Sequence, residues 1–171
     1  MRFLLTVLLS FVCFASWGAQ PVTTPATIVR SFTITNYTGT DLIAGDVTAQ
    51  GIEVPGVTRV TTGSSLLVGL FYRCSNTNGT SVDLVITKQP ITVPANSAPF
   101  NYSEADATNI VNVIHLTTGD FTPFATTNST AFRSFTMPIQ TATNSMFVYP
   151  VCRQAITNAG NDRVIVTLIP D

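Results

Sequence analysis

Short segments rich in threonine, valine and isoleucine, separated by glycine, proline and asparagine, run through the whole chain. The 171 residues include 28 threonines, and β-branched side chains favour extended strands. Several segments alternate apolar and polar residues, which predicts strands with one buried face. Examples are IVRSFTIT at 28–35 and SVDLVITK at 81–88. The pattern predicts an all-β fold, an antiparallel β-sandwich or a small closed barrel, over residues 28–171.

One segment, SLLVGLFYR at 65–73, is apolar on both of its faces. Such a strand is expected in a buried centre rather than at a half-wet edge. The turn residues SNTNGT follow it, so 65–73 and 81–88 are predicted to pair as a hairpin. The last strand, within 163–169, alternates clearly, and a long unpaired edge there would favour assembly with another copy.

The segments between these strands are less regular. Residues 41–49 are predicted to form a strand in which Gly45 marks a bulge. The best helix candidate is SEADATN at 103–109, where Ser103 and Asp106 resemble a capping box. It is followed by IVNVIHL, a predicted strand, and by TTGDFTPFATTNST, a predicted long loop. The fold is therefore expected to contain at most one short helix.

The first 19 residues have the order of a secretory signal peptide. Arg2 is a basic n-region, residues 3–15 are an apolar h-region, and small residues follow up to Ala19. The apolar stretch is shorter than the about 20 residues of a spanning helix. Residues 1–19 are thus predicted to be a signal peptide, and 20–27 a short extended segment. We expect the protein to be secreted, periplasmic or at the cell surface, without an integral membrane segment after cleavage.

Export changes what the cysteines are expected to do. Cys13 leaves with the signal peptide, and the mature chain keeps Cys74 and Cys152. Two cysteines in an oxidising compartment most simply pair, so a Cys74–Cys152 disulfide is predicted. Neither cysteine belongs to a CxxC motif or a Cys-His cluster, which argues against zinc.

Low charge excludes several kinds of partner. Only 10% of the residues are charged, against about 25% in typical soluble domains. Without Arg2, seven basic and nine acidic residues leave a net charge of −2. No basic patch is visible, so nucleic-acid binding is not expected. A threonine-rich surface of this kind suits repeated self-contact or adhesion.

No motif for catalysis stands out. The only histidine, His115, lies inside the predicted strand at 110–116, where a structural role is expected, and no GxSxG motif occurs. Glu104 and Asp106, near Asn109, are a conceivable calcium site, but acids in the first turn of a helix explain them better. We expect no enzyme activity, no cofactor and no metal.

Two resemblances bear on function. FTITNYTGTDLI at 32–43, followed by VTTGSSLLVGL at 60–70, resembles the opening of aegerolysin-type secreted β-sandwiches. Those begin with a strand, an Asn-Thr turn, a second strand and a Gly-Ser turn. Size, threonine content, low charge and a predicted single disulfide resemble exported pilin subunits. The chain departs from pilins in a cysteine spacing of 78 and in VIVTLIPD, which lacks their terminal aromatic residue.

These observations predict an exported, non-catalytic protein with a structural or adhesive role through a protein partner or self-assembly. The alternative is a secreted ligand-binding domain for carbohydrate or lipid headgroups. Sugar sites commonly use aromatic platforms, and the four tyrosines are the candidates after Trp17 leaves with the signal peptide. A loop-borne pocket lined by tyrosines would favour this alternative.

Overall fold

The structure is a computed structural model of the chain. It describes residues 26–35, 41–76, 78–93, 98–125, 128–157 and 161–170. The predicted signal peptide, residues 1–19, and most of the segment 20–27 lie outside the described residues.

Strands account for most of the described chain, so the all-β prediction is confirmed. The strands are β1 (Ile28–Ile34), β2 (Asp41–Leu42), β3 (Ile52–Val54), β4 (Ser64–Cys74), β5 (Val82–Thr87), β6 (Ile110–Leu116), β7 (Phe121–Ala125), β8 (Asn128–Gln140), β9 (Met146–Cys152), β10 (Ile156–Thr157) and β11 (Asp162–Pro170). One helical turn, α1 (Glu104–Ala107), and a 3₁₀ turn, η1 (Thr118–Asp120), complete the elements. Ser103 caps α1 by accepting a hydrogen bond from the Asp106 amide, as the sequence predicts.

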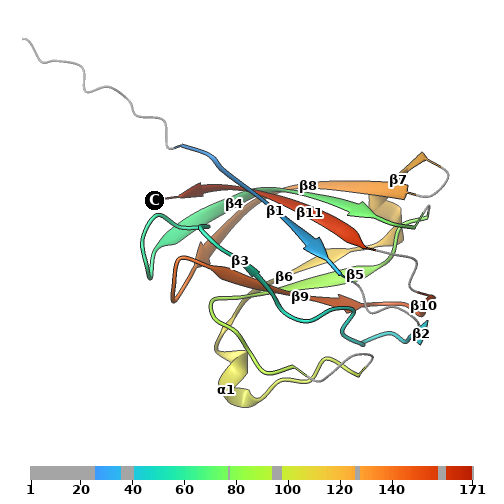
Figure 1. Cartoon of the computed structure of the whole chain (residues 1–171), viewed down its shortest axis with the longest axis horizontal. Helices are drawn as coiled ribbons and strands as arrows, with labels where there is room; N and C mark the ends of the chain where they lie inside the picture. The colour runs from blue at the N-terminus through green and yellow to red at the C-terminus, as the bar shows by residue number, and fades with distance from the viewer. Residues whose placement is uncertain are drawn as a thin grey trace, which may run out of the picture.

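The strands form two main antiparallel sheets, which lie one above the other in Figure 1. The five-stranded sheet has the order β1-β11-β4-β8-β7, and the four-stranded sheet has the order β3-β9-β5-β6. The first long strand pairs with the last, β3 with β9, β4 with β8, and β5 with β6. This nested pairing is the strand order of a jelly roll. Among the described residues the strands stay in separate sheets and do not close into one barrel.

Both sheets contribute to one hydrophobic core. Alternation along β11 turns Val164, Val166 and Leu168 inward. The facing sheet contributes Leu84 and Ile86 from β5. Each of these five side chains is at most 2% exposed, and burial of each contributes about 1.5–3 kcal/mol relative to an exposed position.

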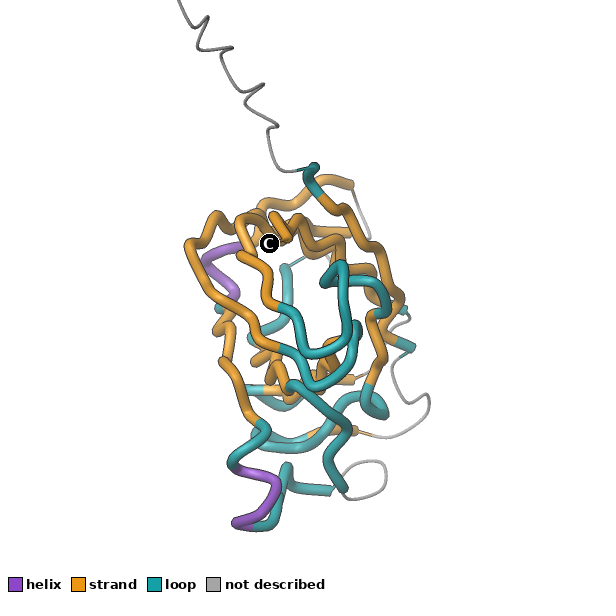
Figure 2. The backbone as a smooth tube through the Cα atoms, turned by 90° about the vertical axis from the view of Figure 1, so that its left-hand side faces the viewer, coloured by secondary structure: helices purple, strands orange, loops and turns teal. Residues whose placement is uncertain are grey.

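A second, smaller core covers the outer face of the four-stranded sheet. Val85, Ile91, Tyr149 and Val151 form it beneath the connection between β5 and β6. The Tyr149 hydroxyl accepts from the Ile91 amide at 2.9 Å and donates to the Ile91 carbonyl at 3.2 Å. Figure 2 shows the loop that carries α1 at the bottom of the view, beneath the strands. Every residue of β5 is therefore buried, although the sequence of β5 alternates.

Three local predictions were wrong. The segments at 65–73 and 81–88 do not form a hairpin, because β4 and β5 belong to different sheets. Within 41–49 only Asp41–Leu42 forms a strand, and Gly45, with φ of +98°, lies in a turn. The predicted loop after β6 contains β7, which pairs with β8. In each case long-range pairing overrides the local pattern.

The last strand does not offer an unpaired edge. β11 lies between β1 and β4 and pairs with both, so its backbone groups are used within the chain. The expected route to assembly through an unpaired edge at residues 163–169 is therefore contradicted.

Tyr72 and Asp162 form a buried polar contact in the main core. The Tyr72 hydroxyl donates to Asp162 Oδ2 at 2.7 Å, and burial, followed by the charge of Asp162, raises the pKa of Tyr72 well above 10.0. The pKa of Tyr72 is thus higher in the folded protein than in the unfolded chain. The contribution of protonated Tyr72 to stability is complete below pH 10 and is lost as the pH rises through the folded-state pKa. We expect the free energy of unfolding to fall above pH 10, and to fall less steeply in Tyr72→Phe. Urea unfolding at a series of alkaline pH values measures this, and equal slopes for the two proteins would contradict it.

Candidate functional site

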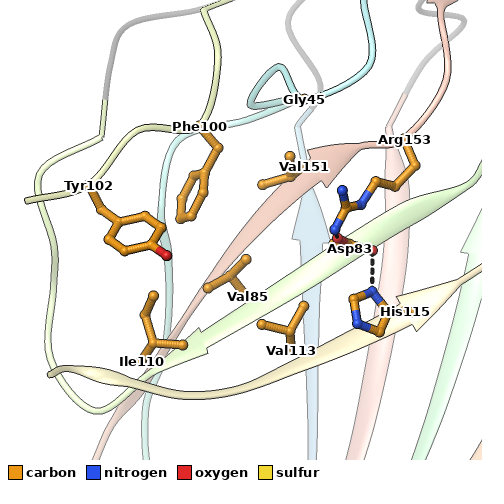
Figure 3. A pocket seen from close by; sticks show the side chains of 10 residues that line it. All are labelled: Gly45, Asp83, Val85, Phe100, Tyr102, Ile110, Val113, His115, Val151 and Arg153. Carbon is orange, nitrogen blue, oxygen red and sulfur yellow. Dashed lines mark hydrogen bonds and ion pairs between the residues drawn. The ribbon is translucent and has the colours of Figure 1, made fainter. Parts of the chain in front are cut away.

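A hollow of about 290 Å³ opens on the outer face of the four-stranded sheet. Its floor consists of Val85 of β5, Val113 of β6 and Val151 of β9 (Figure 3). Phe100 and Tyr102, from the loop before α1, form one wall. We call this hollow the outer pocket. It is apolar at the aromatic wall and polar at the opposite end.

Sheet register assembles the polar end. Asp83 lies opposite His115 in β6 and opposite Val151 in β9. Arg153 follows two residues after Val151, so its side chain reaches the same face (Figure 3). The sequence predicts that Asp83 and Val85 share one face of their strand, and the structure confirms it.

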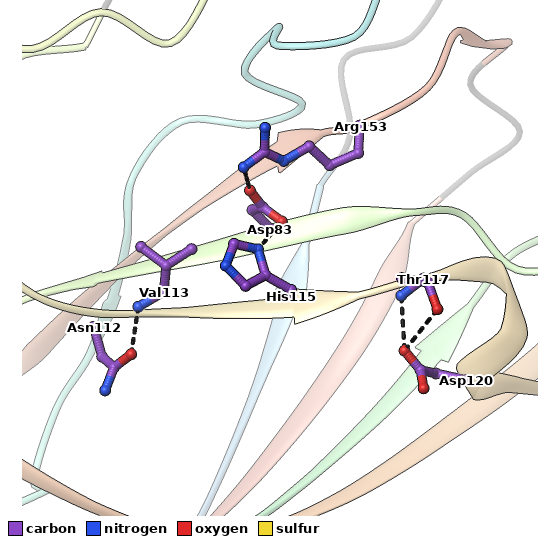
Figure 4. A network of polar contacts seen from close by, with 7 residues as sticks. All are labelled: Asp83, Asn112, Val113, His115, Thr117, Asp120 and Arg153. Atoms are coloured by element: carbon purple, nitrogen blue, oxygen red, sulfur yellow. Dashed lines mark hydrogen bonds and ion pairs between the residues drawn. The ribbon is translucent and has the colours of Figure 1, made fainter.

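The Asp83 carboxylate holds two neighbours in place. His115 Nδ1 lies 2.7 Å from Asp83 Oδ1, and Arg153 forms an ion pair with Asp83 Oδ2 (Figure 4). The Asp83 side chain is only 5% exposed, whereas His115 is 64% and Arg153 54% exposed. The hydrogen bond from Arg153 to Asp83 raises the pKa of the guanidinium. Because both carboxylate oxygens are engaged, His115 and Arg153 are the groups that a ligand meets.

The geometry limits the chemistry of this cluster. An ionised carboxylate only accepts hydrogen bonds, so the Nδ1 of His115 carries the proton and Nε2 is directed elsewhere. Among the hydrogen bonds of the described residues, none joins Nε2 to a serine, threonine or cysteine. Within the described part of the chain, an acid–histidine pair like that of a catalytic triad thus occurs without a nucleophile hydrogen-bonded to the histidine. The prediction that the protein is not an enzyme remains a prediction.

The predicted disulfide is not found. Cys74 and Cys152 are both free and buried. They end strands of different sheets, and each thiol has its own partner: Cys74 donates to Thr80 Oγ1 at 3.5 Å, and Cys152 donates to the Ile43 carbonyl at 2.7 Å. Neither the expected compartment nor the number of cysteines determines where a thiol points in the fold.

Both thiols are expected to react slowly in the folded protein. Burial is the main cause that raises the pKa of Cys74 and of Cys152 above 9.0, and the thiolate is the reactive form. Iodoacetamide at neutral pH should therefore label both cysteines slowly in the native protein and rapidly in urea. Mass spectrometry counts the labels, and a chain that takes up none in urea without reductant would restore the disulfide.

The acidic residues near α1 have a structural role. Asp106 accepts a hydrogen bond from the Ser103 hydroxyl at 2.8 Å, and Asn109 accepts one from Gln89 at 2.8 Å. The interpretation of Glu104 and Asp106 as first-turn acids is confirmed. Within the described ranges, no three His, Cys, Asp or Glu side chains gather in a group that could hold a metal ion.

A second surface lies on the outer side of the five-stranded sheet. Phe71 of β4 lies between Ile165 of β11 and Phe132 of β8 in the sheet register. Val29 of β1 pairs with Thr167 of β11, which lies two residues after Ile165 and therefore on the same face of the strand. Val29 thus faces the same way as Ile165. Phe132 is 70%, Val29 56% and Phe71 37% exposed. We call these four residues the exposed sheet face.

The exposed sheet face corrects one further expectation. The apolar pattern of 65–73 predicts burial on both faces. The structure buries only the inner face of β4 and leaves the outer face, with Phe71, in contact with solvent. Arg73 and Arg163, paired across β4 and β11, lie at one end of this face.

No protein-family model and no curated protein matches the chain. Among solved structures it is similar to those of the infectious bursal disease virus Gx and Gt strains. The identities are 14% and 11%, the TM-scores 0.32 and 0.33, and the match covers 82% of this chain and 32% of those chains. A VP2 subviral particle of the same virus gives 14% identity and a TM-score of 0.32, with 82% and 33% covered. The chain thus spans about a third of the length of these proteins.

Proposed function

We propose that the protein is an exported, non-catalytic β-sandwich with a structural or adhesive role, exerted by contact between copies at a cell surface or in the periplasm. The observation that carries the proposal is the exposed sheet face. Large apolar side chains clustered on a surface commonly mark an interaction site. Phe71 and Phe132 are neighbours in register and are aromatic, the residue type enriched where interfaces are strongest.

Size and charge support a second copy as the partner. The outer side of the five-stranded sheet has strands about 4.8 Å apart and some seven residues long. Its area is roughly 400 Å² when the sheet is treated as flat and the side chains are left out. That is the same order as the ~800 Å² that one partner contributes to a standard interface. Without residues 1–19 the chain has seven basic and nine acidic residues, a net charge of −2, so copies repel one another weakly.

The export part of the proposal rests on the leader pattern in residues 1–19. Among the described residues, no helix is long and apolar enough to cross a membrane. Mass spectrometry of the exported protein tests export, because cleavage near Ala19 changes the mass by a known amount. A full-length product at the membrane would contradict the proposal.

The contact surface is tested by a paired substitution. Phe71→Ser with Phe132→Ser should reduce self-association by at least about tenfold, since each change removes an exposed aromatic anchor. Val60→Ser is the matched control, because Val60 is 64% exposed and lies outside the exposed sheet face. Size-exclusion chromatography with light scattering measures the mass of each. Equal association by all three proteins would show that another surface is used.

A second candidate function is the binding of a carbohydrate or a lipid headgroup. The outer pocket favours it, because a loop-borne tyrosine, Tyr102, lines a hollow with a polar end. Tyr72 and Tyr149 are buried, which leaves Tyr102 as the exposed tyrosine of the described chain. Tyr37 lies outside the described residues.

A further inference from the structure

We infer that the outer pocket binds one neutral sugar ring, either a free monosaccharide or the terminal residue of a glycan. The inference rests on the second candidate function, ligand binding, and names the ligand class. Three features of the pocket carry it: the hydrogen-bonding character of its polar end, its aromatic wall and its size.

The polar end suits a hydroxyl group. Nδ1 of His115 lies against Asp83, so an imidazole in its neutral form presents Nε2 as an acceptor. Arg153 presents the N–H groups that Asp83 does not use. A hydroxyl both donates and accepts a hydrogen bond, so one hydroxyl, or two on adjacent carbons, satisfies both groups. A carboxylate has no proton to donate to Nε2.

The charge balance points the same way. Asp83 and Arg153 form an ion pair, and their charges cancel when the imidazole is neutral. With the imidazole in that form, the polar end carries no net charge to attract an anion. The second candidate function also includes phosphate-containing headgroups. These need a surplus cation in the pocket, and the polar end does not supply one.

The aromatic wall and the floor suit the apolar side of a sugar ring. The Phe100 and Tyr102 rings have centroids 5.4 Å apart and are tilted by 51°. Tyr102 is 44% exposed, so part of its ring is open to a ligand. Val85 and Val113 lie beneath the same space (Figure 3). C–H groups of a pyranose can pack against these surfaces while its hydroxyls face the polar end.

The size of the pocket sets the size of the ligand. Its volume, about 290 Å³, lies at the lower limit of the roughly 300–1,000 Å³ of small-molecule sites. One ring fits, and a long acyl chain does not. Because His115 and Tyr102 are partly exposed, further sugars of a glycan can extend into solvent.

The test is an NMR titration of the ¹⁵N-labelled mature protein with methyl glycosides of mannose, galactose, glucose and N-acetylglucosamine. Phosphocholine and benzoate serve as charged comparison probes. We expect at least one glycoside to shift the amide signals of Tyr102, His115 and Arg153 in a saturable way, and neither charged probe to do so. Saturable shifts with phosphocholine or benzoate alone would overturn the sugar assignment and leave ligand binding in place. No saturable shift with any probe would overturn both.

Two variants locate the effect. Tyr102→Ala should weaken glycoside binding by about tenfold, as the loss of one aromatic contact predicts. Phe124→Ala, which changes an exposed aromatic residue of β7 on the other sheet, should leave it unchanged. Thermal melting is the control that tests whether both variants fold. Equal weakening by the two variants, or none by Tyr102→Ala, would overturn the assignment to the outer pocket.

Discussion

Replacing Asp162 with alanine is expected to lower the free energy of unfolding by about 3 kcal/mol. Asp162 is 5% exposed, and its carboxylate accepts hydrogen bonds from Tyr72 and Ser75. Tyr72 Oη donates to Oδ2 at 2.7 Å, and the amide and hydroxyl of Ser75 donate to Oδ1 at 2.8 and 3.0 Å. The substitution leaves a buried tyrosine hydroxyl and a backbone amide without their acceptor, and stranded buried donors are costly.

Urea unfolding of Asp162→Ala and of Glu104→Ala measures the difference. Glu104 lies in the first turn of α1 and is exposed, so its removal should cost less than about 1 kcal/mol. The comparison separates loss of a buried acceptor from loss of a negative charge. Similar small effects of both substitutions would contradict the assigned role of Asp162 in linking the start of β11 to β4.

The second large effect is expected at Gly79, in the turn between β4 and β5. Its φ is +71°, which costs a residue with a side chain about 1–2 kcal/mol. A Cβ there would also lie 2.4 Å from Cγ of Phe121, and overpacking adds about 1–3 kcal/mol. Gly79→Ala should therefore lower the free energy of unfolding by about 3 kcal/mol.

Gly45→Ala is the matched control for Gly79→Ala. Gly45 also has a positive φ, +98°, but nothing lies within 4 Å of a Cβ placed there. Gly45→Ala should show the backbone cost alone, about 1–2 kcal/mol. The excess in Gly79→Ala then measures the clash with Phe121, by chemical denaturation of both variants. Equal losses would mean that Phe121 moves aside without cost.

Strand positions were largely predictable from the sequence, but strand partners were not. Alternation placed β1, β5 and β6 within a residue or two of their observed bounds. The turn SNTNGT suggested a hairpin, yet β4 pairs with β8 and β5 with β9 and β6. In a jelly roll most partners are far apart in sequence, and a local turn signal carries no information about which sheet the next strand joins.

The candidate site was missed for the same reason. Asp83 and His115 are 32 positions apart and each lies in a strand without a recognisable motif. Only the register of β5 and β6 brings them together. The outward position of Asp83 between two inward apolar residues was visible in the sequence, and a buried acid on such a face requires partners. That signal could have prompted a search for a cation on the neighbouring strands.

The double apolar pattern of β4 shows where sequence and structure together say more than either alone. The sequence indicates that both faces of the strand are suited to burial, and the structure covers only one of them. The face of β4 that the structure leaves uncovered is part of the exposed sheet face. Its apolar residues are the basis for the proposed contact between copies.

Sedimentation velocity of the mature protein over a wide range of concentrations tests that contact most directly. The account predicts a sedimentation coefficient that rises with concentration, and a rise that Phe71→Ser with Phe132→Ser abolishes. A single monomeric species at every concentration would contradict self-association through the exposed sheet face and leave ligand binding at the outer pocket as the better-supported function.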